Sequence, residues 1–215
     1  MENKEMLVKA GKRMLHSNLT VETWGNISIR DPKSGKIYLT PSAMDYDSCC
    51  LNDIVVCDIN GEILEGSRKP TIEKDLHLSV YRNRPEVNAI VHTHPIYSMV
   101  FACTGTTIPP VIDEAAQVLG DVVRVADYAL PGSLDLAQNC VDTLGQEANA
   151  CLLQSHGAVC VGDSIEMAFK VASVLEMTAQ IYTLILQTNQ VPLAISESDI
   201  QSMRDFATNH YGQDK

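Results

Sequence analysis

The chain has 215 residues, of which 45% are hydrophobic and 20% charged, a balance that is typical of a globular protein and argues against a disordered or fibrous chain. This length favours a single domain spanning residues 1–215 over two small ones. The formal net charge of −11 is opposite to the positive surface of nucleic-acid and anionic-membrane binders, so we expect neither partner.

No targeting or membrane-spanning segment is indicated. Charged residues are scattered through residues 1–15, which argues against a secretory signal. The most apolar stretch, residues 171–186, is interrupted by Glu176 and Gln180 and is too short for a membrane span. The seven cysteines are odd in number and lack a CxxC spacing, so we expect free thiols in a reducing, cytoplasmic setting.

Helices and strands are intermixed along the sequence. Apolar spacing and turn residues predict helices over residues 4–18, 71–83, 95–103, 133–144, 165–188 and 198–209. Strands are predicted over residues 26–30, 37–40, 54–59, 62–64, 89–94, 122–125, 151–154 and 159–162. Thr71 and Ser133 are the expected N-caps of their helices, and Gly145 is the expected stop. Two predicted hairpins imply antiparallel pairing, which favours a layered α/β/α or α+β domain over a doubly wound parallel sheet.

Two of the six histidines, His92 and His94, lie at the end of the predicted strand 89–94. Side chains two residues apart on a strand point to the same face, so the two imidazoles are presented together. Paired imidazoles suit a first-row divalent metal ion. The alternative is a chance pair at a strand end, satisfied by water or backbone groups.

His156 is the candidate third imidazole. It lies between two predicted strands, and Gly157 would let the backbone turn tightly directly after it. A lone histidine in such a place is more often a structural hydrogen-bonding group, and it gains weight only in combination with the other two. Three imidazoles with an open position are typical of a catalytic metal site, because a closed structural site has four protein ligands.

Glu73 lies in the first turn of the predicted helix 71–83. The helix dipole alone would favour a carboxylate there. The functional alternative is a fourth metal ligand or a general base beside the ion. His77 lies one turn further on, close to Glu73 on the helical face, and is interpreted as its supporting or structural partner. His16 and His210 fall on amphipathic helices and are interpreted as ordinary surface or packing residues.

Three short segments offer groups that suit an anion. Residues 24–26 precede a strand, residues 40–43 end one, and residues 69–71 open a helix whose N-terminus at 71–73 is a candidate phosphate cradle. The alternative is that these segments are only turns and caps. None matches a Walker or dinucleotide fingerprint, so neither ATP nor NAD is indicated.

Five motifs follow one another along the chain: GNISIR at 25–30, TPSAMDYD at 40–47, EGSRKPTIEKDLH at 65–77, VHTHP at 91–95 and LLQSHGAVCVG at 152–162. In these motifs and their spacing the chain resembles the class II aldolase/adducin family, and within it most closely the L-fuculose-1-phosphate aldolases. The resemblance implies a three-layer α/β/α sandwich with a central, largely antiparallel sheet. It also implies a C4 homotetramer with active sites at subunit interfaces, and a divalent ion, with Zn²⁺ expected and Mn²⁺ or Co²⁺ as alternatives.

The resemblance also implies roles for individual residues. The metal ligands would be His92, His94 and His156, with Glu73 as a ligand in the resting site and as the acid/base once substrate displaces it. Tyr211 matches a C-terminal tyrosine that the family supplies from a neighbouring subunit, and it would donate toward the aldehyde half of the substrate. The residues that fall where the family holds the substrate phosphate are Gly25, Asn26, Ser42, Ala43, Thr71 and Ile72.

The resemblance favours a metal-dependent aldolase that cleaves a small ketose phosphate, similar to L-fuculose 1-phosphate, to dihydroxyacetone phosphate and an aldehyde. The alternatives are an epimerase similar to L-ribulose-5-phosphate 4-epimerase, a tetronate-phosphate decarboxylase, and a non-catalytic, adducin-like interaction domain. The epimerase has aspartates in place of Glu73 and Gln117, which weakens that alternative. The aldolase pattern has a tyrosine in place of Asp113, a hydroxyl in place of Ile72 and a glycine in place of Ala43, so the fit to the aldehyde and phosphate ends is incomplete.

Overall fold

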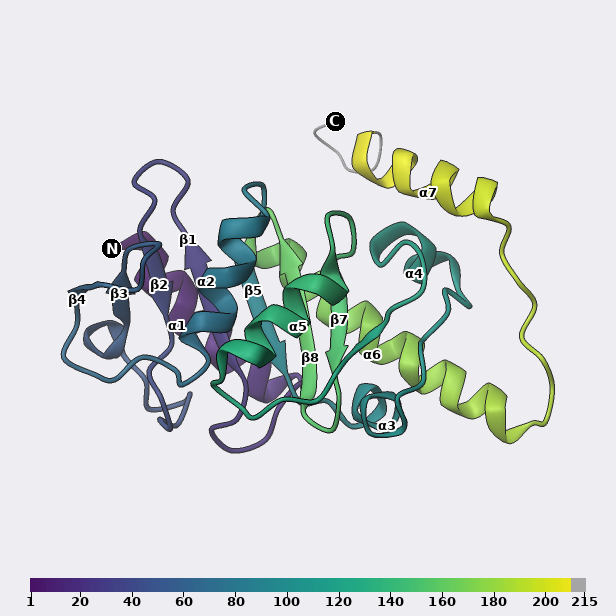
Figure 1. Cartoon of the computed structure of the whole chain (residues 1–215), viewed down its shortest axis with the longest axis horizontal. Helices are drawn as coiled ribbons and strands as arrows, with labels where there is room; N and C mark the ends of the chain where they lie inside the picture. The colour runs from purple at the N-terminus through teal and green to yellow at the C-terminus, as the bar shows by residue number, and fades with distance from the viewer. Residues whose placement is uncertain (210–215) are drawn as a thin grey trace.

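The computed structural model describes residues 1–209, which contain one eight-stranded sheet in the order β4-β3-β2-β1-β5-β8-β7-β6 (Figure 1). The strands are β1 Asn26–Arg30, β2 Ile37–Leu39, β3 Val55–Cys57, β4 Ile63–Glu65, β5 Ala89–Thr93, β6 Val125–Ala126, β7 Ala150–Leu153 and β8 Gly157–Gly162. The α-helices are α1 Glu2–His16, α2 Lys74–Asn83, α3 Ile96–Thr104, α4 Asp113–Val118, α5 Leu134–Leu144, α6 Ile165–Gln187 and α7 Glu197–Asn209. A short 3₁₀ helix, η1, spans Leu51–Asp53.

The sheet is largely antiparallel, as predicted. Neighbouring strands run antiparallel except for β6 and β7, which are parallel and are connected through α5. The two predicted hairpins are β1–β2 and β3–β4. At the centre, β1 pairs with β5 so that Asn26 lies opposite His92 and Ser28 lies opposite Ile90. This register places the motif at residues 25–30 beside the strand that carries the paired histidines.

Helices pack on both faces of the sheet. Figure 1 shows α2 and α5 in front of the strands and α6 behind them. Side chains of β5 alternate between two hydrophobic cores, as the strand period requires. Ala89 and Val91 belong to the core shared with α1, α3 and α6, whereas Ile90 belongs to the core shared with α2 and α5. Because both faces are covered, β7 and β8 are apolar throughout, whereas β1 and β5 also bury polar side chains, among them Asn26, Ser28 and His92.

The helix after Pro70 starts later than predicted. α2 begins at Lys74 with Glu73 at its N-cap, so the expectation that Thr71 caps the helix is wrong. The cause is backbone pairing, because the Thr71 N–H donates to the Thr40 carbonyl over 3.1 Å. The Thr71 hydroxyl accepts from the Glu73 N–H over 3.2 Å. Residues 71–73 therefore form a turn tied to the loop after β2 and are not the helix N-terminus itself.

Other element boundaries differ less from the predictions. Ser133 caps α5 by accepting from the Leu136 N–H, and Gly145 follows its last residue, as predicted. The strand predicted over 122–125 lies instead at β6. α4 was not predicted, because six residues are too few to establish a helical period. All seven cysteines are free, as expected.

α6 is long and apolar enough to cross a membrane by length and composition alone, contrary to the expectation drawn from residues 171–186. Core helices of soluble proteins pass the same test. In this structure α6 contacts β5, β8 and α3. Phe169, Ala172 and Leu175 on the contacting face are buried.

Candidate metal centre

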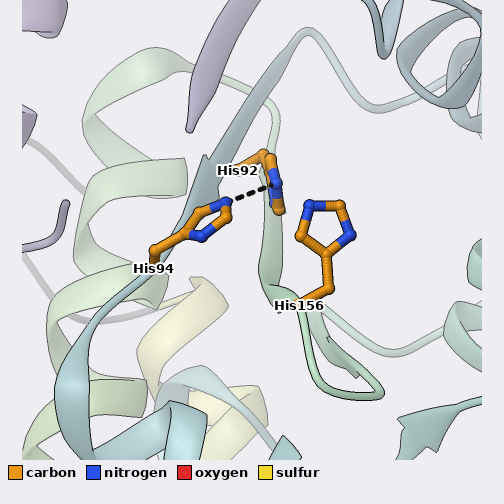
Figure 2. Close-up of side chains that lie close together, drawn as sticks. All are labelled: His92, His94 and His156. Carbon is orange, nitrogen blue, oxygen red and sulfur yellow. Dashed lines mark hydrogen bonds between the residues drawn. The ribbon is translucent and has the colours of Figure 1, made fainter. Parts of the chain in front are cut away.

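Three imidazoles meet at one end of the central strands. His92 is on β5, His94 follows that strand directly, and His156 lies in the turn between β7 and β8. The ring centroids are separated by 4.8, 4.9 and 5.2 Å, and the candidate ligand atoms all lie within 4.8 Å of one another. Figure 2 shows the three rings gathered from these two places in the sheet. The predicted three-histidine cluster is therefore present in the structure.

The close approach of the two strands depends on Gly157. A Cβ atom at this position would lie 2.4 Å from the Thr93 carbonyl oxygen and 3.0 Å from Cε1 of His92. The left-handed backbone conformation of the turn belongs to Ser155, with a φ of 54°, and not to the glycine. The prediction that Gly157 provides the tight turn is thus wrong, because its absent side chain makes room for β5.

Glu73 completes the cluster from the opposite side. Its Oε2 atom lies 3.1 Å from Nε2 of His92, and its Oε1 atom lies 3.3 Å from Nε2 of His156. The side chain is only 5% exposed. The helix dipole, the alternative reason for a carboxylate at this position, does not account for these contacts with two imidazoles.

The electrostatic environment acts differently on the four groups of the cluster. Burial acts to raise the pKa of Glu73, but the neighbouring His92 and other partners outweigh burial, and the pKa lies well below its ordinary value. Burial acts to lower the pKa of His92, yet the charge of Glu73 raises it overall. Burial and the charge on His92 lower the pKa of His94 to about 3 and the pKa of His156 to about 4. Metal ligands of these types must be deprotonated, so the ionised Glu73 and the lowered pKa values of His94 and His156 favour metal binding, whereas the proton that Glu73 favours on His92 must leave when a metal ion binds.

The convergence of candidate ligand atoms suits a cation between these groups. Nδ1 of His92 lies 3.0 Å from the Ala158 carbonyl oxygen, which can only accept, so Nδ1 carries a proton and Nε2 is the nitrogen left for a metal ion. This Nε2 atom lies 3.0 Å from Nε2 of His94 and 3.1 Å from Oε2 of Glu73. Among the described residues, Oε1 of Glu73 is buried without a hydrogen-bond partner, and it lies 3.3 Å from Nε2 of His156. Converging nitrogen and carboxylate donors of this kind suit Zn²⁺ and related first-row ions.

Asn26 and His77 lie directly behind the carboxylate. The Asn26 amide donates to Oε2 of Glu73 over 2.8 Å, and its oxygen lies 2.6 Å from Nε2 of His77. His77 is completely buried, and burial lowers its pKa to about 3. The expectation that His77 supports Glu73 is met through Asn26, which lies between them.

A cavity of about 380 Å³ opens beside Glu73, His94 and His156. All six residues expected to hold the substrate phosphate line it, namely Gly25, Asn26, Ser42, Ala43, Thr71 and Ile72. Thr23, Trp24, Pro41 and Pro131 complete the lining. Of these, Thr23 and Pro131 were not expected, because neither a lone threonine before the motif at 24–26 nor a proline before a helix carries a chemical signature in the sequence. The structure thus joins five separate sequence motifs around one hollow.

Several groups around this cavity are already used by the protein backbone. The Ser42 N–H donates to the Lys69 carbonyl over 2.9 Å, and the Thr71 N–H is occupied by Thr40. The side-chain amide of Asn26 is held by Glu73. Ala43 adopts a φ of 52°, in the left-handed region that favours glycine, so the alanine retains a glycine-like backbone conformation.

The remaining candidate residues are either outside the described residues or away from the cavity. Tyr211 and His210 fall outside the described residues, so the role expected of Tyr211 stays a prediction. Asp113 lines a separate hollow beside α7. His16 is a surface residue paired with Asp47, as expected of an ordinary surface histidine.

Comparison with known proteins agrees with this arrangement. A family model described as "Class II Aldolase and Adducin N-terminal domain" matches residues 5–183. The chain is 36% identical over 204 residues to the 5-deoxy-D-ribulose 1-phosphate aldolase of Bacillus thuringiensis serovar kurstaki, covering 94% of this chain and 93% of that protein. It is 34% identical over 174 residues to an L-fuculose phosphate aldolase of Methanococcus maripaludis, covering 81% and 92% of the two chains. A solved structure of an L-fuculose 1-phosphate aldolase superposes with a TM-score of 0.90 at 34% identity, covering 95% of each chain.

Proposed function

Because the chain belongs to the class II aldolase and adducin family and is a class II aldolase, a carbon–carbon lyase, we propose that it cleaves a ketose 1-phosphate to dihydroxyacetone phosphate and an aldehyde. The observation that carries this proposal is the buried Glu73 carboxylate beside three imidazoles at the edge of a cavity. The non-catalytic alternative explains neither the burial of this carboxylate among the imidazoles nor the cavity beside it.

The names of the relatives suggest the substrate class. One relative acts on L-fuculose phosphate and another on 5-deoxy-D-ribulose 1-phosphate. Both sugars end in a methyl group, and cleavage of either 1-phosphate between C3 and C4 gives dihydroxyacetone phosphate and a methyl-terminated aldehyde. We expect this chain to act on a small deoxyketose 1-phosphate of this kind, similar to L-fuculose 1-phosphate.

The metal would be held by His92, His94 and His156, with Glu73 as the fourth ligand before substrate enters. Zn²⁺ is the expected ion, with Mn²⁺ or Co²⁺ as alternatives. When bound, the ion supplies Lewis-acid stabilisation of the negative charge that develops on the ketose half as the bond breaks.

Glu73 is the residue placed to manage the proton at C3 of the dihydroxyacetone phosphate half. It lines the cavity, and its low pKa keeps it ionised, so it can accept a proton in the condensation direction. In the cleavage direction the same carboxyl group returns that proton. Tyr211 would donate to the aldehyde half from a neighbouring subunit.

The phosphate would lie against the six residues that line the cavity with Glu73. Within the described residues the Ile72 N–H and the Ser42 hydroxyl form no hydrogen bond in the protein and are available to an anion. Ile72 is 65% exposed and offers no hydroxyl, so the phosphate site has one donor fewer than the family pattern. The glycine-like backbone of Ala43 supports retention of the family's loop conformation.

The organisation of the whole protein is part of the proposal. One sheet with helices on both faces supports a single domain over residues 1–215 and a three-layer α/β/α sandwich. A cytoplasmic homotetramer with active sites at subunit interfaces fits Ile96, Leu130 and Leu134, which are 74%, 68% and 71% exposed in one chain.

A cleavage screen over ketose 1-phosphates tests the proposal, with released dihydroxyacetone phosphate measured by a coupled dehydrogenase. We expect turnover with deoxyketose 1-phosphates, loss of turnover on chelation and recovery on adding Zn²⁺, Mn²⁺ or Co²⁺. His16→Ala is the matched control, because His16 is an exposed histidine. Its ion-pair partner is Asp47, which belongs neither to the histidine cluster nor to the cavity lining. The proposal is wrong if no ketose 1-phosphate releases dihydroxyacetone phosphate with any of the three ions.

A further inference from the structure

A buried polar seam runs from Glu73 into the interior between α2 and β1. The seam consists of Glu73, His77 and Tyr81, spaced four residues apart on α2 and its N-cap, and of Asn26 and Ser28, spaced two apart on β1. Residues four apart share a helix face and residues two apart share a strand face, so the two rows face each other. All five residues are at most 5% exposed.

The two rows interdigitate through four hydrogen bonds. The Tyr81 hydroxyl lies 2.7 Å from the Ser28 hydroxyl, which lies 2.6 Å from Nδ1 of His77. Nε2 of His77 lies 2.6 Å from the Asn26 oxygen, and the Asn26 amide donates to Oε2 of Glu73 over 2.8 Å. The seam therefore connects a tyrosine in the core to the candidate acid/base without a break.

The ionised carboxylate fixes the direction of every bond in the seam. Glu73 can only accept, so Asn26 must present its NH₂ group to the carboxylate and its oxygen to His77. Nε2 of His77 must then carry a proton, and a neutral ring leaves Nδ1 to accept from the Ser28 hydroxyl. Ser28 in turn accepts from Tyr81. Burial, which lowers the pKa of His77, independently favours the neutral ring.

The reverse assignment is unfavourable at both ends. A flipped Asn26 amide would direct its oxygen at the carboxylate. A charged His77 would donate to Ser28, forcing the Ser28 hydroxyl onto Tyr81 and leaving the Tyr81 hydrogen without an acceptor in the seam. A buried polar hydrogen without a partner costs about 1–3 kcal/mol.

We propose that His77 is a positioning residue that acts through Asn26 to hold Oε2 of Glu73, so that Oε1 stays available for the acid–base step. This inference rests on the proposed function of Glu73. Oε1 has no hydrogen-bond partner among the described residues, whereas Oε2 is anchored. His77 does not line the cavity, so it acts on the reaction only through its neighbour.

Two substitutions at His77 separate positioning from packing. His77→Gln can still donate to Asn26 and accept from Ser28, whereas His77→Leu fills similar space and can do neither. We expect His77→Leu to lower kcat by about 10- to 100-fold, the range seen when the outer partners of metal-site ligands are lost. KM for the ketose phosphate and the zinc content should stay near wild type, and His77→Gln should recover most of kcat. A merely structural role would instead lower the amount of folded enzyme and leave kcat per bound zinc unchanged.

A second measurement does not depend on activity. Nitrogen-15 NMR of the full-length, zinc-loaded wild-type chain should show His77 neutral, with the proton on Nε2. The inference is overturned if the proton resides on Nδ1, if the ring is charged, if His77→Leu retains wild-type kcat, or if His77→Gln is as impaired as His77→Leu. If wild-type protein cleaves no ketose phosphate but His77 carries its proton on Nε2, the proposed function fails while the seam assignment stands.

Discussion

Gly157→Ala is the change that most directly tests how the strands build the metal centre. The new methyl group would lie 2.4 Å from the Thr93 carbonyl oxygen, 3.0 Å from His92 and 3.3 Å from His94. Ordinary contact begins near 3.4 Å, so the strands must separate by 3.4 − 2.4, or about 1 Å. The atom in closest contact belongs to the backbone of β5, so no side-chain rotation can relieve the overlap.

A displacement of about 1 Å at a catalytic group can cost about 100-fold in rate. His156 precedes Gly157, so it moves with the displaced backbone, away from His92 and His94. We therefore expect Gly157→Ala to lower zinc affinity and to lower kcat/KM by about 100-fold. Overpacking of this kind destabilises a protein by about 1–3 kcal/mol, so most of the chain should still fold.

Zinc titration, steady-state cleavage of a ketose 1-phosphate and thermal unfolding together provide the assay. Gly105→Ala is the control: Gly105 directly follows α3, and its Cβ would meet no atom within 4 Å. Its φ of 65° makes alanine somewhat strained there, so Gly105→Ala should lose some stability and retain zinc affinity. Wild-type zinc affinity in Gly157→Ala would refute the reasoning, because the strands would then have no need for a glycine.

Three further substitutions test the other parts of the site. His94→Ala should lose most bound zinc and most turnover, measured by metal analysis and the cleavage assay, because one of few ligands is removed; full zinc occupancy would contradict the three-histidine site. Glu73→Gln should keep its zinc but lose turnover by about 100-fold or more, as for loss of a general base; a kcat equal to that of the wild type would show that another residue is the acid–base group. Ile72→Ser adds a hydroxyl at an exposed position of the cavity lining and should lower KM for the phosphorylated ketose about ten-fold, with free-sugar activity unchanged; an unchanged KM would show that residue 72 does not contact the phosphate.

The His92–His94 pair of the histidine cluster was predictable from the sequence because its signal is local. Two histidines two residues apart on a strand must share a face, and both lie in a segment whose apolar pattern already indicates a strand. His156 alone did not indicate a metal ligand, and it became a candidate only in combination with His92 and His94. The structure brings the three together because β5 pairs with β8, which is a long-range contact that periodicity does not specify.

The seam was not predictable, although every one of its residues is visible in the sequence. The spacing of Glu73, His77 and Tyr81 indicates a shared helical face, but polar residues on a helix usually face solvent. Asn26 and Ser28 share a strand face with the same ambiguity. Only the packing of α2 against β1 shows that both polar rows are buried against each other, and that each satisfies the hydrogen bonds of the other.

The length of the Glu73 side chain is what links the seam to the metal centre. Its carboxylate lies 2.8 Å from the Asn26 amide on one side and 3.1 and 3.3 Å from the nitrogens of His92 and His156 on the other. An aspartate at this N-cap would be shorter by one carbon–carbon bond, about 1.5 Å, and could not make both sets of contacts from the same backbone position. An enzyme with aspartate here must therefore hold its carboxylate differently. The contacts of residue 73 therefore require a glutamate in this chain, and the preference for an aldolase over the epimerase alternative follows only when this requirement is joined to the family pattern.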